Sequence, residues 1–270
     1  METSQFWKLS QPEYDSDYDH ALINGSSEHP FGMPGINCSV CGATWGGSRI
    51  LAVSCPESLR KRKEIKDRWP ISLEAHKTLQ NLVLRELAEN GVKMEALRPG
   101  DSFQPAYLDV PSRPRADFLW SSLGSIVVSQ RVKDILEQSG VNDVDFYEVI
   151  MRKVGMREAS FPAPVPSSGE PEDLINELPL LKNLDGVERY YEMIILKESR
   201  YPPGGTPRSI CEGCGRPDVD NSTRSIIMTP EMWQGDPIFF LATTLYVIVT
   251  DPVKKLLENI RSSNVVFERM

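Results

Sequence analysis

Four of the five cysteines stand in two short motifs of the same form. Cys38 and Cys41 form the first pair and Cys211 and Cys214 the second, and a glycine follows each pair, giving CxxCG twice. The two-residue spacer lets both sulfurs of a pair turn toward one point, and the glycine permits a tight bend that aims backbone N–H groups at them. Structural zinc takes four ligands in a tetrahedron, and thiolates favour it over magnesium or calcium. The spacing therefore predicts one closed Cys₄ zinc site, one zinc per chain, with no position open for a catalytic water.

The separation of the two motifs is unusual, because 169 residues lie between Cys41 and Cys211. A metal bound by both motifs would tie the two halves of the chain together. Two other interpretations stay open: a redox-active CxxC pair, and CxxCG turns (zinc knuckles) that have lost their metal. The redox interpretation fits less well, because a reactive CxxC stands at a helix N-terminus, whereas glycine in a loop follows each pair here. The fifth cysteine, Cys55, is expected to be a small buried hydrophobic residue.

Residue patterns typical of enzymes are missing from the sequence. The histidines at 20, 29 and 76 have no cysteine, serine or carboxylate partner at a recognisable spacing. His76 falls near the start of a helix expected over 72–90, at a position expected to be partly exposed. No GxSxG, HExxH, P-loop or GxGxxG stands in a suitable context. We therefore expect a protein that is not an enzyme and has no catalytic residues; a redox or metal-handling enzyme would need an open ligand position or a reactive thiol.

Composition indicates an ordinary globular protein. The chain has 270 residues, of which 40% are hydrophobic and 25% charged. The longest apolar run, 237–250, is shorter than a membrane-spanning helix and is expected to form buried strands. The N-terminus shows no basic start followed by an apolar core, so no secretory signal is expected. With cysteines paired as in metal sites, these features predict a cytoplasmic protein.

The net charge of −8 bears on the partner. An acidic protein is repelled by nucleic-acid phosphates and by anionic membranes, and it suits a basic partner. Solubility alone is the other explanation of the charge. The basic run at 60–68 is interleaved with acidic residues, as on a solvated helix face. We therefore expect no membrane and no nucleic acid as partner.

Two segments, 118–149 and 239–270, align without a gap at an offset of 121. Each follows the order strand, short helix, strand, and Ser129 and Thr250 can cap the two helix starts. Leu136 and Leu257 should then be buried at equivalent places. The other explanation is that any two strand–helix–strand units share a hydrophobic pattern. Identical residues at equivalent places include Val128, Val132, Lys133, Leu136, Glu137, Val144 and Phe146, which match Val249, Val253, Lys254, Leu257, Glu258, Val265 and Phe267.

The fold class predicted from these features is α+β, with two related strand–helix–strand units joined by a Cys₄ zinc-knuckle pair. Residues 1–160 form an N-terminal half with the first knuckle and the first unit. Residues 161–171 form a proline-rich linker. Residues 172–270 form a C-terminal half with the second knuckle and unit. The zinc is expected to bridge both halves into one compact domain.

Four segments of the chain resemble, in the same order, the double-CxxCG motif immunity proteins of social, myxobacterial-type bacteria. These are FGMPGINCSVCGATW (31–45), PISLEAHKTLQNLV (70–83), CEGCGR (211–216) and VIVTDPVKKLLENIRSSNVVFERM (247–270). The resemblance implies a cytoplasmic antidote that binds and neutralises a cognate toxin, delivered between kin cells and possibly nuclease-like. It makes Cys38, Cys41, Cys211 and Cys214 the paired-motif positions. The alternative is a zinc-ribbon protein that binds nucleic acid or is associated with transcription.

The best local candidate for contact with a basic toxin is a loop-like acidic stretch near the N-terminus. If the stretch is extended, its alternate carboxylates point to one side. Tyrosines between them could serve as anchors, because tyrosine is enriched at binding hot spots. An acidic loop without a role is the other interpretation. The candidate contact residues are Glu13, Tyr14, Asp15, Asp17, Tyr18 and Asp19.

Overall fold

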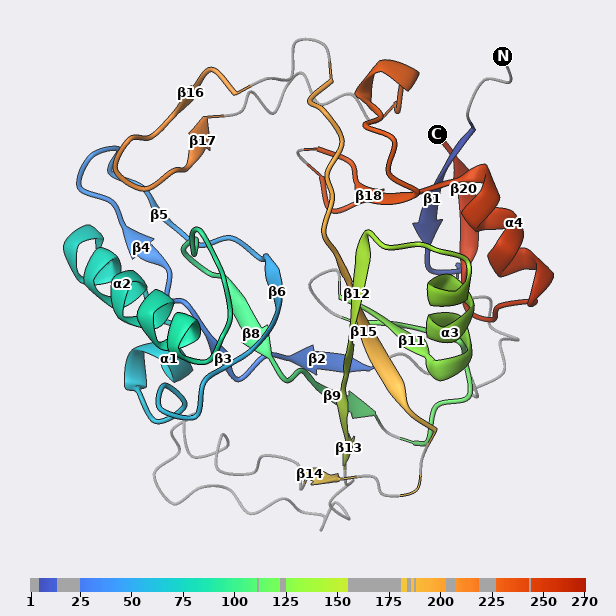
Figure 1. The fold of residues 1–270 in the computed structure, drawn as a ribbon, viewed down its shortest axis with the longest axis horizontal. Helices are drawn as coiled ribbons and strands as arrows, with labels where there is room; N and C mark the ends of the chain where they lie inside the picture. Colours follow the sequence, from blue (N-terminus) through green and yellow to red (C-terminus); the bar gives the residue numbers. More distant parts are fainter. Residues whose placement is uncertain are drawn as a thin grey trace, which may run out of the picture.

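The computed structural model describes residues 5–13, 25–110, 112–121, 125–154, 181–183, 186, 188–202, 207–218, 227–242 and 244–270. Over these residues the chain is a mixed α+β structure with several small sheets (Figure 1). The helices are α1 (Lys63–Asp67), α2 (Leu73–Glu89), α3 (Gln130–Gln138) and α4 (Asp251–Asn259), with a short 3₁₀ helix at Pro230–Met232. The strands are β1 (Phe6–Ser10), β2 (Ser26–Glu28), β3 (Phe31–Gly32), β4 (Ile36–Asn37), β5 (Thr44–Trp45), β6 (Ile50–Ser54), β7 (Ile71–Ser72), β8 (Ser102–Gln104), β9 (Tyr107–Val110), β10 (Phe118–Trp120), β11 (Ile126–Ser129), β12 (Val144–Glu148), β13 (Ile150–Val154), β14 (Leu181–Asn183), β15 (Tyr190–Ile195), β16 (Ser209–Ile210), β17 (Pro217–Asp218), β18 (Ile238–Phe240), β19 (Val247–Thr250) and β20 (Val266–Arg269).

The described elements gather in two lobes. One, which we call the α2 lobe, holds α1, α2 and the short strands β3 to β8 (Figure 1). The other, the α3–α4 lobe, holds those two helices and two four-stranded sheets, β10-β11-β15-β12 and β18-β19-β1-β20. The sheet β14-β13-β9-β2 lies between and below them in this view. The β16–β17 hairpin, although late in the chain, lies beside β4 and β5 of the α2 lobe.

Helix α2 forms where the apolar spacing predicts it. The Ser72 hydroxyl caps its start by accepting a hydrogen bond from the Ala75 backbone N–H at 3.2 Å. Leu79, Val83 and Leu87 are buried at helical spacing. His76 belongs to the same stripe and is only 3% exposed, so the expectation of a partly exposed histidine is wrong. The reason is its position three residues before Leu79, on the face that packs on the core.

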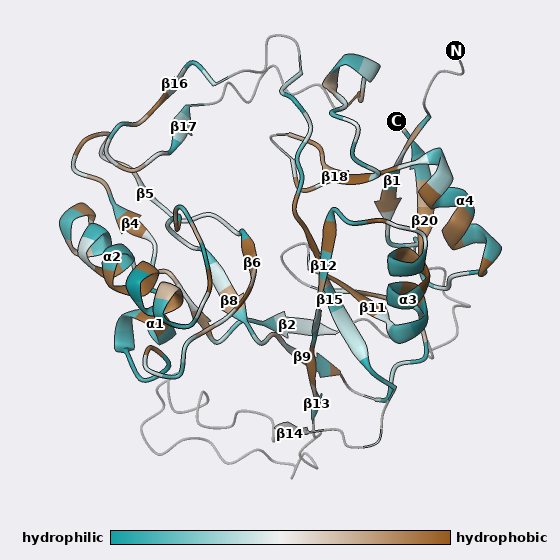
Figure 2. Ribbon diagram, viewed as in Figure 1, coloured by the Kyte–Doolittle hydropathy of each residue, from teal (hydrophilic) through white to brown (hydrophobic). Residues whose placement is uncertain are grey.

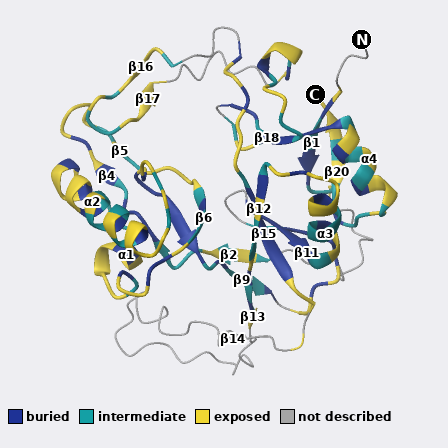
Figure 3. Ribbon diagram, viewed as in Figure 1, coloured by how far each residue is buried: buried dark blue, intermediate teal, exposed yellow. Residues whose placement is uncertain are grey.

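The two sheets of the α3–α4 lobe have the same plan. In each, a hairpin (β10–β11 or β18–β19) leads into a helix and then into a strand at the far edge. A middle strand, β15 or β1, pairs antiparallel with both neighbours, so the strands before and after each helix run parallel to one another. Figure 3 shows β15 as largely buried, and the strands β11 and β19, each beside a middle strand, are buried along their whole length. Figure 2 shows β11 as mostly hydrophobic. Both sheets therefore mix residues from distant parts of the chain.

The pairing registers of the two sheets agree residue by residue. From β11 and β19 onward, the residue numbers of equivalent positions differ by 121, as predicted. In the preceding strands β10 and β18 they differ by 120. The alignment without a gap is thus wrong at one point, because the second hairpin loop is one residue longer. The equivalent pairs along the middle strands are Ser129–Tyr190 and Thr250–Phe6, Val128–Tyr191 and Val249–Trp7, and Tyr147–Glu192 and Glu268–Lys8.

The helices α3 and α4 make matching contacts. Each carries a lysine that pairs with a glutamate one turn later and lies over an aromatic ring of the middle strand. The Nζ–Oε distances are 2.7 Å for Lys133–Glu137 and 2.6 Å for Lys254–Glu258. The same nitrogens lie 5.2 Å from the Tyr191 ring centre and 4.5 Å from the Trp7 ring centre. Such cation–π contacts fix each helix on its own sheet.

The buried leucines of the two helices offer a matched stability test. Leu136 is 0% and Leu257 is 1% exposed, so the prediction that both are buried is confirmed. Leu136→Ala and Leu257→Ala should each lower the free energy of unfolding by roughly 2–5 kcal/mol, because each leaves a cavity in the shared core. Urea denaturation measures both. Leu245→Ala, at a leucine that is 60% exposed, is the control and should change little. Costs below about 1 kcal/mol for both core variants would contradict the role of Leu136 and Leu257 as core positions.

No helix among the described residues is long and apolar enough to cross a membrane.

Candidate metal centre

The two CxxCG motifs fold into hairpin turns of the same shape. Strands β4–β5 flank the first motif and β16–β17 the second, with pairing registers that match at an offset of 173. In the first turn the Gly42 N–H donates to the Cys38 carbonyl at 2.9 Å, and in the second the Gly215 N–H donates to the Cys211 carbonyl at 2.8 Å. Gly42 and Gly215 have φ values of 71° and 73°, a conformation that favours glycine. The predicted role of the trailing glycine is present in both turns.

The structure brings all four motif cysteines together. The Cys38 and Cys211 sulfurs are 3.8 Å apart, as are those of Cys41 and Cys214. All four sulfurs lie within 4.8 Å of one another. A tetrahedron with zinc–sulfur bonds of about 2.3 Å has edges of about 3.8 Å, whereas a disulfide bond measures about 2.05 Å. All five cysteines are free thiols, and the four-cysteine cluster could hold a metal ion such as zinc.

The backbone around the first cysteine of each motif favours the thiolate, the form that binds metal. The Cys41 backbone N–H lowers the pKa of Cys38 to about 6. The Cys214 backbone N–H likewise lowers the pKa of Cys211. Burial raises the pKa of Cys214 to about 11. Cys38 and Cys211 therefore lose their protons more readily than Cys214, and a dication bound among the sulfurs would displace the remaining protons.

Three residues other than the cysteines build the surroundings of the cluster. The Trp45 indole N–H donates to the Cys214 sulfur at 3.2 Å, and this bond spans the two halves of the chain. Leu73, the first residue of α2, packs in the same small apolar cluster as Cys38. Val40 of the first knuckle lies against Gly213 of the second, where an added Cβ would come within 2.7 Å of the valine Cγ2. The sequence pattern did not single out Trp45 or Val40, although both stand within four residues of Cys41 or Cys38.

The remaining candidate residues lie away from the cluster or outside the described residues. Cys55 is 1% exposed, and burial raises its pKa to about 11, as expected for an unreactive core thiol. Glu13 is exposed. The other proposed toxin contacts, Tyr14, Asp15, Asp17, Tyr18 and Asp19, lie outside the described residues. The proline-rich linker at 161–171 also lies outside them.

The basic run pairs with its own acidic neighbours. Nitrogen–oxygen distances are 3.0 Å for Arg60–Glu57, 3.6 Å for Arg62–Glu64 and 4.0 Å for Lys63–Asp67. Such exposed pairs add little stability, but they cancel part of the local positive charge. The arrangement is that of a solvated surface segment.

A buried polar cluster centred on Glu192 was not foreseen from the sequence. The carboxylate is 0% exposed and accepts hydrogen bonds from His29 Nε2 at 2.9 Å, Gln104 Nε2 at 2.7 Å and the Ser125 hydroxyl. Burial raises the pKa of this carboxyl, but the hydrogen bonds and the His29 charge outweigh it and hold the pKa below its usual range. His29 and Ser125 both bind the carboxylate, so the serine is not placed against the histidine as in a nucleophile–base pair. The cluster joins β15 to β8 and to the residues just after β2 and just before β11.

The comparisons with known proteins add no relative. No model of a protein family matches the chain, and no curated protein was found to be similar to it.

Proposed function

We propose that this chain is an immunity protein that binds a cognate toxin and blocks it, with one structural zinc ion at the four-cysteine cluster. The observation that carries the proposal is the pair of CxxCG motifs, which are far apart in sequence and meet in one closed thiol cluster. The motifs stand in the same order as in the double-CxxCG immunity proteins that the sequence resembles. A site with four protein ligands leaves no position for a substrate, which supports a scaffold role for the metal.

The charge of the chain supports a basic partner. A net charge of −8 favours fast encounter with a positively charged surface, such as the phosphate-binding face of a nuclease. The described basic run is partly neutralised by its own ion pairs, which argues against phosphate binding at this segment. Covering the partner's site requires no catalytic residues of its own.

The finer organisation of the fold is also a proposal. We infer that the chain arose by duplication of a unit with the order strand, knuckle, hairpin, helix, strand. The first copy is β1, the first knuckle and β10-β11-α3-β12; the second is β15, the second knuckle and β18-β19-α4-β20. Matching registers in the knuckles, hairpins and middle strands support this more strongly than shared hydrophobicity does. Each copy places its first strand in the sheet of the other, so zinc and strand exchange would both hold the copies together.

Protection of cells tests the function directly. If the gene beside that of this chain encodes a toxin, the C-terminal domain of that toxin should stop the growth of a bacterial host, and coexpression of this chain should restore growth. The two proteins should also co-elute in gel filtration. Failure to relieve an established toxicity, with no complex formed, would overturn the proposal. Tight binding of double-stranded DNA at low salt would instead favour a zinc-ribbon protein.

The acidic stretch can be tested in the same complex. Changing Glu13, Asp15, Asp17 and Asp19 to Gln or Asn should slow association with the toxin by roughly tenfold at low salt, because exposed charges steer encounter. The effect should shrink as salt rises. The control changes four exposed glutamates elsewhere, Glu74, Glu89, Glu95 and Glu148, to Gln, with the same change in net charge. Equal association rates for the two variants would place the contact face elsewhere.

A further inference from the structure

A pocket of about 330 Å³ lies where the two lobes meet. The α2 lobe contributes the start of β6 and the preceding Ser48 and Arg49, together with Arg98. The α3–α4 lobe contributes residues 193–198, at and after the end of β15, and residues around the β18–β19 turn. Pockets of this size at the junction of two structural units commonly bind small molecules.

One end of the pocket is cationic. Arg49 and Arg98 are both held by Asp101, whose side chain is completely buried. The Asp101 carboxylate accepts the Arg49 Nε–H at 2.9 Å and the Arg98 backbone N–H at 2.6 Å. This carboxylate neutralises Arg49, which also binds it through Nη2. The Arg98 guanidinium makes no hydrogen bond or ion pair with the residues that the structure describes, so a positive charge without a partner is anchored at the pocket through its backbone.

Apolar side chains of the α3–α4 lobe also line the pocket. Ile126, Ile195 and Phe240 line it, and they belong to β11, β15 and β18. Leu196 and Leu245 also line it and remain 49% and 60% exposed, among the most exposed large apolar side chains described. Exposed leucines beside a pocket offer area that a ligand would remove from water.

Two further charges limit the choice of ligand. Lys197 lines the pocket, and its Nζ lies 4.0 Å from the Asp143 carboxylate, a pair too long for a good hydrogen bond. Glu198 lines the pocket as well and would repel a second negative charge on a ligand. The lining therefore suits a ligand with one negative charge better than a phosphate or a polyanion.

We propose that this pocket binds an organic monocarboxylate. The carboxylate group binds the Arg98 guanidinium, and an apolar body of several carbons covers Leu245 and the wall formed by β15 and β18. The bound molecule contacts both lobes and strengthens their junction. This site is separate from the thiol cluster, and the proposal does not depend on the toxin partner.

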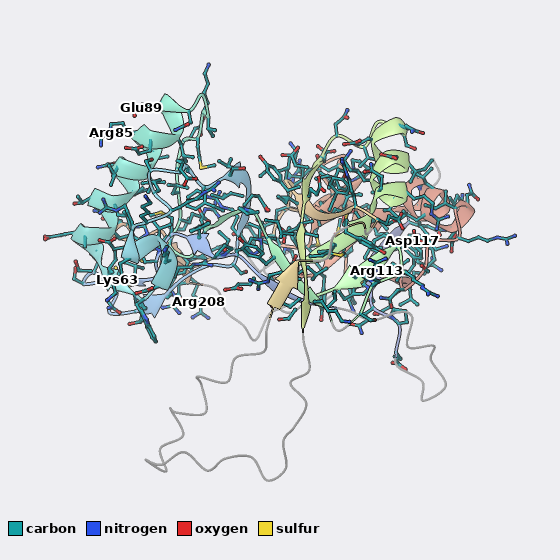
Figure 4. All side chains as sticks on the ribbon, turned by 90° about the horizontal axis from the view of Figure 1, so that it is seen from below. Lys63, Arg85, Glu89, Arg113, Asp117 and Arg208 are labelled. Atoms are coloured by element: carbon teal, nitrogen blue, oxygen red, sulfur yellow. The ribbon has the colours of Figure 1, made fainter. Side chains whose placement is uncertain are left out.

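Calorimetric titration of the full, zinc-loaded chain tests the site, with octanoate as the probe. Octanoate should bind with a one-to-one ratio and raise the melting temperature. Arg98→Gln should weaken binding roughly tenfold or more, because a charge-assisted hydrogen bond is lost. Arg85→Gln makes the same change in charge on the outer side of α2 (Figure 4) and should leave binding unchanged. Leu245→Asp, at an exposed position, should weaken binding by repulsion.

Two further probes, one neutral and one short, distinguish binding at this site from nonspecific apolar binding. Octanol lacks the charge and acetate lacks the apolar body, so both should bind at least tenfold more weakly than octanoate. The proposal is wrong if octanoate does not bind, if octanol binds as tightly, or if Arg98→Gln binds octanoate like the unchanged chain.

Discussion

Replacing Cys38 or Cys214 with serine should remove zinc from the protein and cause a large loss of stability. Each serine leaves three thiolates where four sulfurs now stand within 4.8 Å. With free zinc at about 1,000 times its Kd, the lost binding alone lowers the free energy of unfolding by about 4 kcal/mol. The two largest apolar clusters should keep the chain partly folded, since neither contains these cysteines. Elemental analysis should give one zinc per unchanged chain, and calorimetry should show the fall in melting temperature.

Cys55→Ser is the matched control, because Cys55 is buried like Cys38 but lies in another cluster. It should cost stability through packing while one zinc per chain remains bound. A chelator should lower the melting temperature of the unchanged chain and of Cys55→Ser, and should not change that of Cys38→Ser. Purified protein without zinc, or with iron held as a cluster, would contradict the assignment.

The local structure of this chain could be predicted from sequence because its signals are local. Helix α2 follows from apolar residues at helical spacing and from Ser72 at its start. The helices α3 and α4 follow from two copies of one pattern. The partners of the strands were not predictable in this way. The segment FWKLS indicates a strand, but nothing local shows that β1 pairs with β19 and β20 at the other end of the chain.

The candidate metal centre likewise combines features that the local sequence predicts with features that depend on the tertiary fold. The CxxCG spacing predicts the geometry of each turn. Two identical motifs also suggest one shared metal site, however far apart they stand in the sequence. The contacts between the two CxxCG turns form only in the folded chain. Gly213 needs its small size because Val40 lies against it, and Trp45 reaches Cys214 only once the hairpins meet. The buried partners of Glu192 come from three distant segments, so no spacing in the sequence could reveal them.

Glu192 should be the most sensitive polar position in the fold. Glu192→Ala removes the acceptor for three buried groups, on His29, Gln104 and Ser125. Removing one partner of a buried charged pair costs roughly 3–5 kcal/mol, because the other groups stay buried without partners. Glu192→Gln keeps the shape but loses the charge that faces His29, so its cost should be smaller. Urea denaturation at pH 7 measures both.

The equivalent position in the other four-stranded sheet supplies the control for Glu192. Lys8 occupies the equivalent position on β1, and its side chain is 22% exposed and pairs with Glu268 at 3.0 Å. Lys8→Ala should cost about 1 kcal/mol or less, since solvent screens an exposed pair. Equal losses of unfolding free energy for Glu192→Ala and Lys8→Ala would show that burial does not determine the contribution of Glu192 to stability.

The pH dependence gives a second measurement on Glu192. Its pKa in the folded protein lies below that of the unfolded chain. Such a carboxyl stabilises the fold above its unfolded pKa of about 4.3, and that contribution disappears as the pH falls through the folded pKa. The unchanged protein should therefore lose stability more steeply than Glu192→Gln below about pH 4.3, and the two curves should converge in acid. Parallel curves between pH 7 and pH 3 would mean that the carboxylate is not stabilised by its partners.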